Sequence, residues 1–141
     1  AGRYKALDRE TGEEVWSSSR ELEYAHLSPD GAWLATSQNS PNEDLLLLKL
    51  DGSMVRQLTN DRAIDRWPRY SPDGTRVAFF SNRSGRAQIW EIHTDGSGLR
   101  HLPLDGHDLC YPVYSPDGAR LVGTDENGST WRFDTSSRSI V

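Results

Sequence analysis

Residues 71–81 read Ser-Pro-Asp-Gly-Thr-Arg-Val-Ala-Phe-Phe-Ser, a tight turn followed at once by an apolar run. The tetrapeptide Ser-Pro-Asp-Gly that opens this stretch also occurs at 28–31 and at 115–118, so it recurs at offsets of 43 and 44 residues. In each copy Pro presets the backbone for a type I turn, and Gly supplies a positive φ after it. A repeat with this period indicates a tandem array of one supersecondary unit.

The same order of segments accompanies each turn. An apolar stretch follows it, then a polar loop, a second stretch, another turn and a short final strand; in the middle copy the two stretches are 77–80 and 88–93. A short strand rich in aromatic residues precedes each turn, at 24–27, 67–70 and 111–114. Every unit therefore holds four short strands joined by short turns. Four antiparallel strands in about 40 to 50 residues are typical of a β-propeller blade.

Two further features agree with blades that pack on one another. The run 77–80 is apolar without alternation, which indicates a strand buried on both faces. A β-sandwich or an isolated meander is the alternative, and the near-constant spacing of the turns disfavours it. Pro68 and Pro112 lie in the aromatic strands. Because Pro removes a ladder donor, we expect both at a strand start or at an unpaired edge.

Residues 4–7 and 14–16 resemble the last two strands of one more blade. We therefore expect an all-β fold, a β-propeller segment of about three four-stranded antiparallel blades plus an outer half blade. Propellers close with about four to eight blades, so we expect either part of a longer propeller or copies that complete the ring together. The expected boundaries within a single domain over 1–141 are 1–23 for the half blade and linker, then 24–66, 67–110 and 111–141 for the blades.

Composition and charge narrow the function classes. Of the 141 residues, 35% are hydrophobic and 26% are charged, as in ordinary globular proteins. The net charge is −5 with both signs interspersed, which argues against nucleic acid as a partner. The longest apolar run, 45–48, is far too short to span a bilayer. Cys110 is the single cysteine, so no intrachain disulfide can form.

Residues 70–83, Tyr-Ser-Pro-Asp-Gly-Thr-Arg-Val-Ala-Phe-Phe-Ser-Asn-Arg, followed by Gln88-Ile89-Trp90 and Asp95-Gly96, resemble the repeat of TolB-type propellers. The resemblance covers nearly the whole chain, and the middle unit carries the fullest pattern. The outer units depart from it, since Leu27 precedes the first turn and Gly123-Thr124 replaces the usual Phe-Ser pair in the third. The resemblance implies the propeller fold.

What the resemblance implies about function is broader. TolB-like propellers occur in periplasmic TolB, beside the hydrolase of tricorn and prolyl oligopeptidase groups, in oligogalacturonate lyases, and as sensor domains of bacterial regulators and kinases. One blade motif thus serves several functions, and the fold does not choose among them. The resemblance favours a periplasmic location and leaves a cytoplasmic one open.

Motifs for chemistry are sparse. No Gly-x-Ser-x-Gly elbow, the usual site of a hydrolase serine, occurs in the sequence. The histidines lack the spacing of a helical metal pair. Because lyases of the related type hold a divalent ion with histidines, His101, His107 and Asp108 form a minor metal hypothesis. Our main expectation for this segment is no catalytic residue, no metal site and no cofactor, with the parent protein left open.

The loops predict where binding occurs. The Ser-Pro-Asp-Gly and Asp-Gly-Ser turns should lie on one face of the blades, and the loops between blades and between second and third strands on the other. The second set varies in length and charge, and variable loops on a rigid scaffold usually carry binding. Trp, Tyr and Arg most often dominate interface energetics. The residues that we predict to bind a partner are Asp65, Arg66, Trp67, Arg83, Arg86, His107, Asp108 and Tyr111.

The sequence thus predicts a non-catalytic protein-binding or scaffold module of TolB-like type, which binds through its variable loop face. One alternative is the substrate-gating propeller of a prolyl oligopeptidase-like serine peptidase, and another is the sensor domain of a bacterial regulator. A metal-dependent lyase on the same fold is the third. We expect a protein partner, with self-association that completes the propeller as a further prediction, and neither nucleic-acid binding nor membrane insertion.

Overall fold

The computed structural model describes residues 5–7, 10–17, 22–38, 42–102, 107–136 and 139–140. These residues form 14 strands and no helix, which confirms the all-β expectation. The strands are β1 Lys5–Leu7, β2 Glu14–Ser17, β3 Leu22–Leu27, β4 Trp33–Gln38, β5 Leu45–Lys49, β6 Val55–Gln57, β7 Asp65–Tyr70, β8 Arg76–Ser81, β9 Gln88–His93, β10 Arg100–His101, β11 Cys110–Tyr114, β12 Arg120–Thr124, β13 Thr130–Asp134 and β14 Ser139–Ile140.

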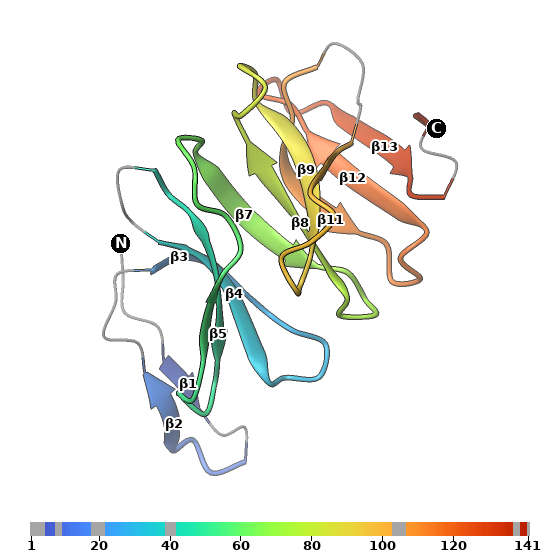
Figure 1. Ribbon diagram of the computed structural model, residues 1–141. Coiled ribbons are helices and arrows are strands. Elements are labelled where there is room, and N and C mark those ends of the chain that lie inside the picture. The colour runs from blue at the N-terminus through green and yellow to red at the C-terminus, as the bar shows by residue number, and fades with distance from the viewer. Residues whose placement is uncertain are drawn as a thin grey trace.

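Three four-stranded antiparallel sheets follow one another along the chain, each with its strands in sequence order. We call β3–β6 the first sheet, β7–β10 the second and β11–β14 the third; β1 and β2 pair as a separate hairpin. The sheets stand side by side as successive blades (Figure 1). The edge strand β7 contacts the edge strands β3 and β11 of both neighbours. The predicted propeller segment is thereby confirmed.

Two details refine the predicted arrangement. The first strands of the three sheets begin at Leu22, Asp65 and Cys110, one or two residues before the expected blade starts at 24, 67 and 111. Pro68 and Pro112 lie in β7 and β11, which are edge strands of their sheets. Their expected position at an unpaired edge is therefore confirmed.

The Ser-Pro-Asp-Gly turns owe their sameness to one set of hydrogen bonds. In the second turn the Ser71 hydroxyl donates to Asp73 Oδ1 at 2.5 Å and accepts from the Arg76 amide at 3.0 Å. The Gly74 amide donates to the Ser71 carbonyl at 2.9 Å, and Gly74 has φ +71°. The first and third turns repeat these bonds at 2.5, 2.9 and 2.9 Å. Local sequence alone therefore fixes the hairpin between the first two strands of every sheet.

The apolar run of β8 is buried on both faces, as predicted. Val77 and Phe79 belong to a core cluster with Leu45 of the first sheet. Ala78, which points the other way, belongs to a second cluster with Leu121 of the third sheet. Phe79 is fully buried, so its truncation to Ala should cost about 3–5 kcal/mol. Packing on both sides of the second sheet thus holds the three sheets, and with them their loops and first strands, in fixed relation.

Candidate functional site

The first strand of each sheet (β3, β7 and β11), which we call its inner strand as opposed to the outer strands β6, β10 and β14, carries an aromatic residue in an unusual backbone conformation. Tyr24, Trp67 and Tyr111 have φ values of +56°, +53° and +52°. Each lies at an irregularity in the pairing of its strand with the next one. A bulky residue with positive φ is uncommon and costs free energy, and a β-bulge re-aims the side chain at that point. The same distortion therefore turns one aromatic side chain out of each sheet at an equivalent place.

These side chains form a continuous row, which we call the aromatic strip (Tyr24, Trp67 and Tyr111). The Tyr24 and Trp67 rings meet edge to face with centroids 5.4 Å apart. The Trp67 and Tyr111 rings are tilted by 36° with centroids 4.2 Å apart. Phe80 supports Trp67 from β8 at 5.2 Å. Tyr24 is 37% and Tyr111 52% exposed, so the strip presents aromatic surface to solvent along the inner edges of three sheets.

Arg66 lies next to the strip and is held by a carboxylate from the neighbouring sheet. Its Nε and Nη2 donate to the two carboxylate oxygens of Glu43, in the loop between β4 and β5. The bond to Glu43 raises the pKa of Arg66. The paired geometry is the planar, bidentate one that gives Arg its directional strength. Arg66 is thus a positioned, charge-balanced neighbour of the aromatic strip.

Asp65 and Arg83 lie beneath the surface. Asp65 is fully buried, and its Oδ2 accepts from Arg83 Nη2 at 2.8 Å. Burial raises the pKa of the Asp65 carboxyl, an effect that Ser81 and Arg83 oppose. The Arg83 guanidinium also lies 3.4 Å from Asp61 and 5.1 Å from the centre of the Trp90 ring. This pair ties the loop after β8 to the start of β7, so it supports the surface rather than forming it.

The other predicted binding residues lie near the junction of the second and third sheets. Arg86 Nε donates to Asp108 Oδ1 at 3.0 Å, and both side chains are half exposed. His107 stacks on Trp131 with centroids 3.7 Å apart. An exposed ion pair of this kind contributes at most about 1 kcal/mol. These groups are available at the surface, and the stack fixes the orientation of the imidazole.

The described part of the chain contains no cluster of side chains that supports the metal hypothesis. His101 packs on Trp90 at 5.0 Å, and burial lowers the pKa of its imidazole. No group of three or more His, Cys, Asp or Glu side chains among the described residues could hold a metal ion. The described part likewise holds no helix long and apolar enough to cross a membrane.

Sequence reasoning missed three contributors to this region: Tyr24, Glu43 and Phe80. Tyr24 occupies the same place in its repeat as Trp67 and Tyr111, so an alignment of the repeats contained the signal for it. Glu43 carried no such signal, because its contact with Arg66 joins two sheets and depends on the path of a loop.

A family model and several named proteins match parts of this sequence. The family model for the TolB beta propeller domain matches residues 6–140. Over 49 residues the chain is 43% identical to a protein TolB homolog of Chlorobium luteolum, which is 35% of this chain and 11% of the relative. Over 75 residues it is 36% identical to the Tol-Pal system protein TolB of a Ruegeria species, which is 47% of this chain and 17% of the relative. The matched segments thus span less than a fifth of these relatives.

Solved structures share the fold over almost the entire chain. A putative TolB from Agrobacterium tumefaciens superimposes with a TM-score of 0.80 at 22% identity, over 99% of this chain and 60% of that one. An oligogalacturonate lyase in complex with manganese gives a TM-score of 0.75 at 19% identity, over 96% of this chain and 40% of that one. These likenesses concern architecture. Since the family model covers nearly all of the sequence, the chain belongs to the TolB beta propeller domain family.

Proposed function

We propose that this chain is a non-catalytic propeller module that binds a protein partner through the aromatic strip. The proposal rests mainly on the threefold repetition of an aromatic residue at a strained backbone position, with Tyr24 and Tyr111 exposed and Trp67 partly buried between them. Strained conformations persist where the surrounding structure enforces them, and they cluster at functional sites. Tyr and Trp are also the side chains that most often anchor protein interfaces.

The chemistry of the strip suggests what kind of partner surface it takes. Its rings are apolar with polar tips, and Arg66 beside it is already balanced by Glu43. A partner should therefore bring apolar or aromatic side chains rather than a dense cluster of one charge. The name of the Ruegeria relative, a Tol-Pal system protein, supports a role in a protein assembly.

The predicted binding residues take different parts in this proposal. Trp67 and Tyr111 form the centre of the interface and Arg66 its edge. Arg86, His107 and Asp108 extend it, whereas the buried Asp65 and Arg83 hold the loops that support it. Self-association, the peptidase-gating role and the sensor role stay predictions.

Photo-crosslinking tests the proposal. A photoreactive phenylalanine analogue at position 111, expressed in the native host, should capture a protein that the same analogue at position 99 does not. Leu99 is the matched control because it is also exposed, at 42%, and lies before the outer strand β10. The captured protein is then purified and titrated against the chain.

The binding constants decide the outcome. Tyr111→Ala should weaken the complex at least about tenfold, since anchor residues at an interface cost that much or more. Leu99→Ala should leave the affinity unchanged. Equal affinities for the wild type and Tyr111→Ala would contradict the proposal, as would equal capture at the two positions.

A further inference from the structure

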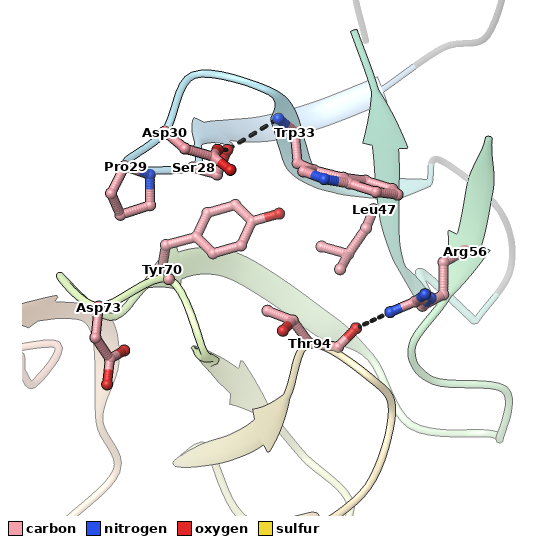
Figure 2. A pocket seen from close by; sticks show the side chains of 10 residues that line it. Ser28, Pro29, Asp30, Trp33, Leu47, Arg56, Tyr70, Asp73 and Thr94 are labelled. Atoms are coloured by element: carbon pink, nitrogen blue, oxygen red, sulfur yellow. Dashed lines mark hydrogen bonds between the residues drawn. The ribbon is translucent and has the colours of Figure 1, made fainter. Parts of the chain in front are cut away.

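A cavity of about 280 Å³ lies between the first and second sheets, on the side of the Ser-Pro-Asp-Gly turns. Trp33 and Leu47 line it from the first sheet, and Tyr70 lines it from the second (Figure 2). Arg56, from the outer strand β6, and Asp30, from the first Ser-Pro-Asp-Gly turn, also line the cavity. This cavity is distinct from the aromatic strip, since none of its lining residues belongs to the strip.

The Tyr70 hydroxyl is the unexplained polar group at this cavity. Tyr70 is only 5% exposed, and its hydroxyl has no hydrogen-bond partner in the described part of the protein. Figure 2 shows that the hydroxyl end of the ring points towards Trp33 and Leu47. A buried hydroxyl without a partner is unfavourable and uncommon. It therefore marks a place where a hydrogen-bonding group from outside the chain would be stabilised.

Arg56 provides a second donor at the same cavity. Its Nη1 donates to the Thr94 carbonyl at 2.6 Å, which bridges the two sheets (Figure 2). Its guanidinium lies 5.9 Å from the centre of the Trp33 ring. A guanidinium carries more N–H donors than this single bond uses. The bond to Thr94 thus holds a cation at the mouth of the cavity.

The contact between the second and third sheets contains the equivalent position, and there it is filled. Strand register identifies the equivalence: Leu47 pairs with Arg56 across β5 and β6, as Glu91 pairs with Arg100 across β9 and β10. Glu91 therefore stands where Leu47 stands one repeat earlier. Glu91 is 1% exposed, so this position holds a buried carboxylate in one sheet and an apolar side chain in the other.

The partners of Glu91 have counterparts at the cavity. The Tyr114 hydroxyl donates to Glu91, and Arg100 Nε donates to it at 2.6 Å. Tyr114 and Arg100 are the equivalents of Tyr70 and Arg56. The contact between the first and second sheets thus has the hydroxyl and the guanidinium that bind a carboxylate, but Leu47 stands in place of the carboxylate itself.

We propose that this cavity binds a small organic acid, whose carboxylate takes the place that Glu91 occupies between the second and third sheets. The carboxylate accepts hydrogen bonds from the Tyr70 hydroxyl and from Arg56, and the apolar body of the acid packs on Trp33 and Leu47. The cavity volume lies just below the range of about 300–1,000 Å³ for sites of drug-sized ligands, so a compact acid fits it best.

The acidic side chains nearby do not prevent this. Asp30 already accepts hydrogen bonds from Ser28 and from the Ala32 amide, and its side chain is exposed to water, which screens its charge. Asp73, the equivalent of Asp30 in the second turn, also lines the cavity; it too is exposed and already accepts hydrogen bonds from Ser71 and from the Thr75 amide. Trp33 holds the position in the first sheet that Arg76 holds in the second, where Arg76 contacts Glu91. The cavity therefore has one cation fewer than the filled site and should bind the acid only weakly.

Titration with phenylacetate, followed by amide and indole N–H signals in NMR spectra, tests the proposal. Saturable shifts are expected at Trp33, Arg56 and Gly74, with a dissociation constant of about 1 mM. Phenylacetamide, which has the same shape without the charge, is the ligand control and should bind at least about fivefold more weakly.

Three variants complete the test. Tyr70→Phe should weaken phenylacetate binding at least about fivefold, and Leu47→Glu should abolish it by supplying the carboxylate internally. Tyr114→Phe, which alters the filled site, should leave it unchanged. The proposal is overturned if the wild type shows no saturable shifts, if the amide binds as well as the acid, or if Tyr70→Phe binds like the wild type. Because Tyr70→Phe removes only one atom, the test stands even if Leu47→Glu does not fold.

Discussion

The two contacts between neighbouring sheets use the same backbone arrangement and differ in what closes them. Between the second and third sheets, the buried carboxylate of Glu91 is bound by Tyr114, Arg76 and Arg100. Between the first and second sheets, Leu47 stands at that position and a cavity borders it. The repeat thus preserves its fold where Leu47 and Trp33 stand in place of Glu91 and Arg76, and the internal ion cluster of one contact is a cavity in the other.

The turns are the part of the two contacts that does not differ. Gly74 of the second turn faces Pro29 of the first, and Gly118 of the third faces Pro72 of the second. Each glycine has a positive φ of about the same size, +71° and +70°. The two contacts can therefore be compared experimentally, with the turns as the shared reference and the residues at Leu47 and Glu91 as the variable.

Among the variants that compare the two contacts, the largest effect is expected from Glu91→Ala. The change leaves Arg100 and the Tyr114 hydroxyl without their acceptor, so the free energy of unfolding should fall by about 3 kcal/mol. The two arginines reach solvent in part, which keeps the loss at the lower end of the range for broken buried pairs. Urea denaturation followed by tryptophan fluorescence measures it.

The exposed Glu126, in the turn between β12 and β13, is the control for this change. Glu126→Ala should alter stability by less than about 0.5 kcal/mol. A loss below about 1 kcal/mol for Glu91→Ala would show that the buried cluster does not hold the second and third sheets together.

Smaller and equal effects are expected from Gly74→Ala and Gly118→Ala. A side chain at positive φ costs about 1–2 kcal/mol, and an added Cβ would meet only ordinary contacts with Pro29 or Pro72. Both variants should therefore lose about 1 kcal/mol in the same urea experiment. If one variant loses over about 1 kcal/mol more stability than the other, the two turns are not equivalent. They could then not serve as the shared reference for comparing the two contacts.

The smallest effect is expected on the stability of the fold at low pH. Hydrogen bonds from Ser71 and from the Thr75 amide lower the pKa of Asp73 from 3.8 to about 2, and similar bonds lower the pKa of Asp30 and Asp117. Because the folded pKa lies below the unfolded one, these groups stabilise the fold fully above about pH 4 and lose that contribution as the pH falls, in the case of Asp73 through about 2. Urea midpoints measured across this interval should decline.

The Asp73→Asn variant isolates the contribution of the second turn. Its urea midpoint should fall less steeply than that of the wild type over the same interval, because one titrating group is gone. Parallel declines in the two proteins would exclude Asp73 as a source of the acid sensitivity.

Much of the fold could be predicted because its signals are local. The bonds of the Ser-Pro-Asp-Gly turn join residues within six positions of one another, and the spacing of those turns gave the strands and the sheets. Burial on both faces, which the structure shows for 77–79, could likewise be read from the absence of polar residues at 77–80.

The candidate site was less accessible to sequence reasoning because it depends on contacts between sheets. Trp67 and Tyr111 were predicted to bind, but their positive φ and their stacking with Tyr24 arise only when three bulged strands lie side by side. Asp65 and Arg83 looked like surface charges of a loop, yet Asp65 is fully buried and pairs with an Arg83 that reaches solvent only in part. The acid site proposed at Tyr70 was inferred by comparing Leu47 with Glu91. Only the strand register shows that these two residues are equivalent.

The most direct test of the difference between the two contacts is one matched pair of variants, Tyr114→Phe and Tyr70→Phe, measured by urea denaturation without added ligand. The first removes a donor to the buried Glu91, so it should cost about 1–2 kcal/mol. The second removes a hydroxyl that has no protein partner in the described residues, so it should cost nothing or stabilise the fold slightly. Equal losses in the two variants would contradict the account, since they would mean that Tyr70 is satisfied as fully as Tyr114.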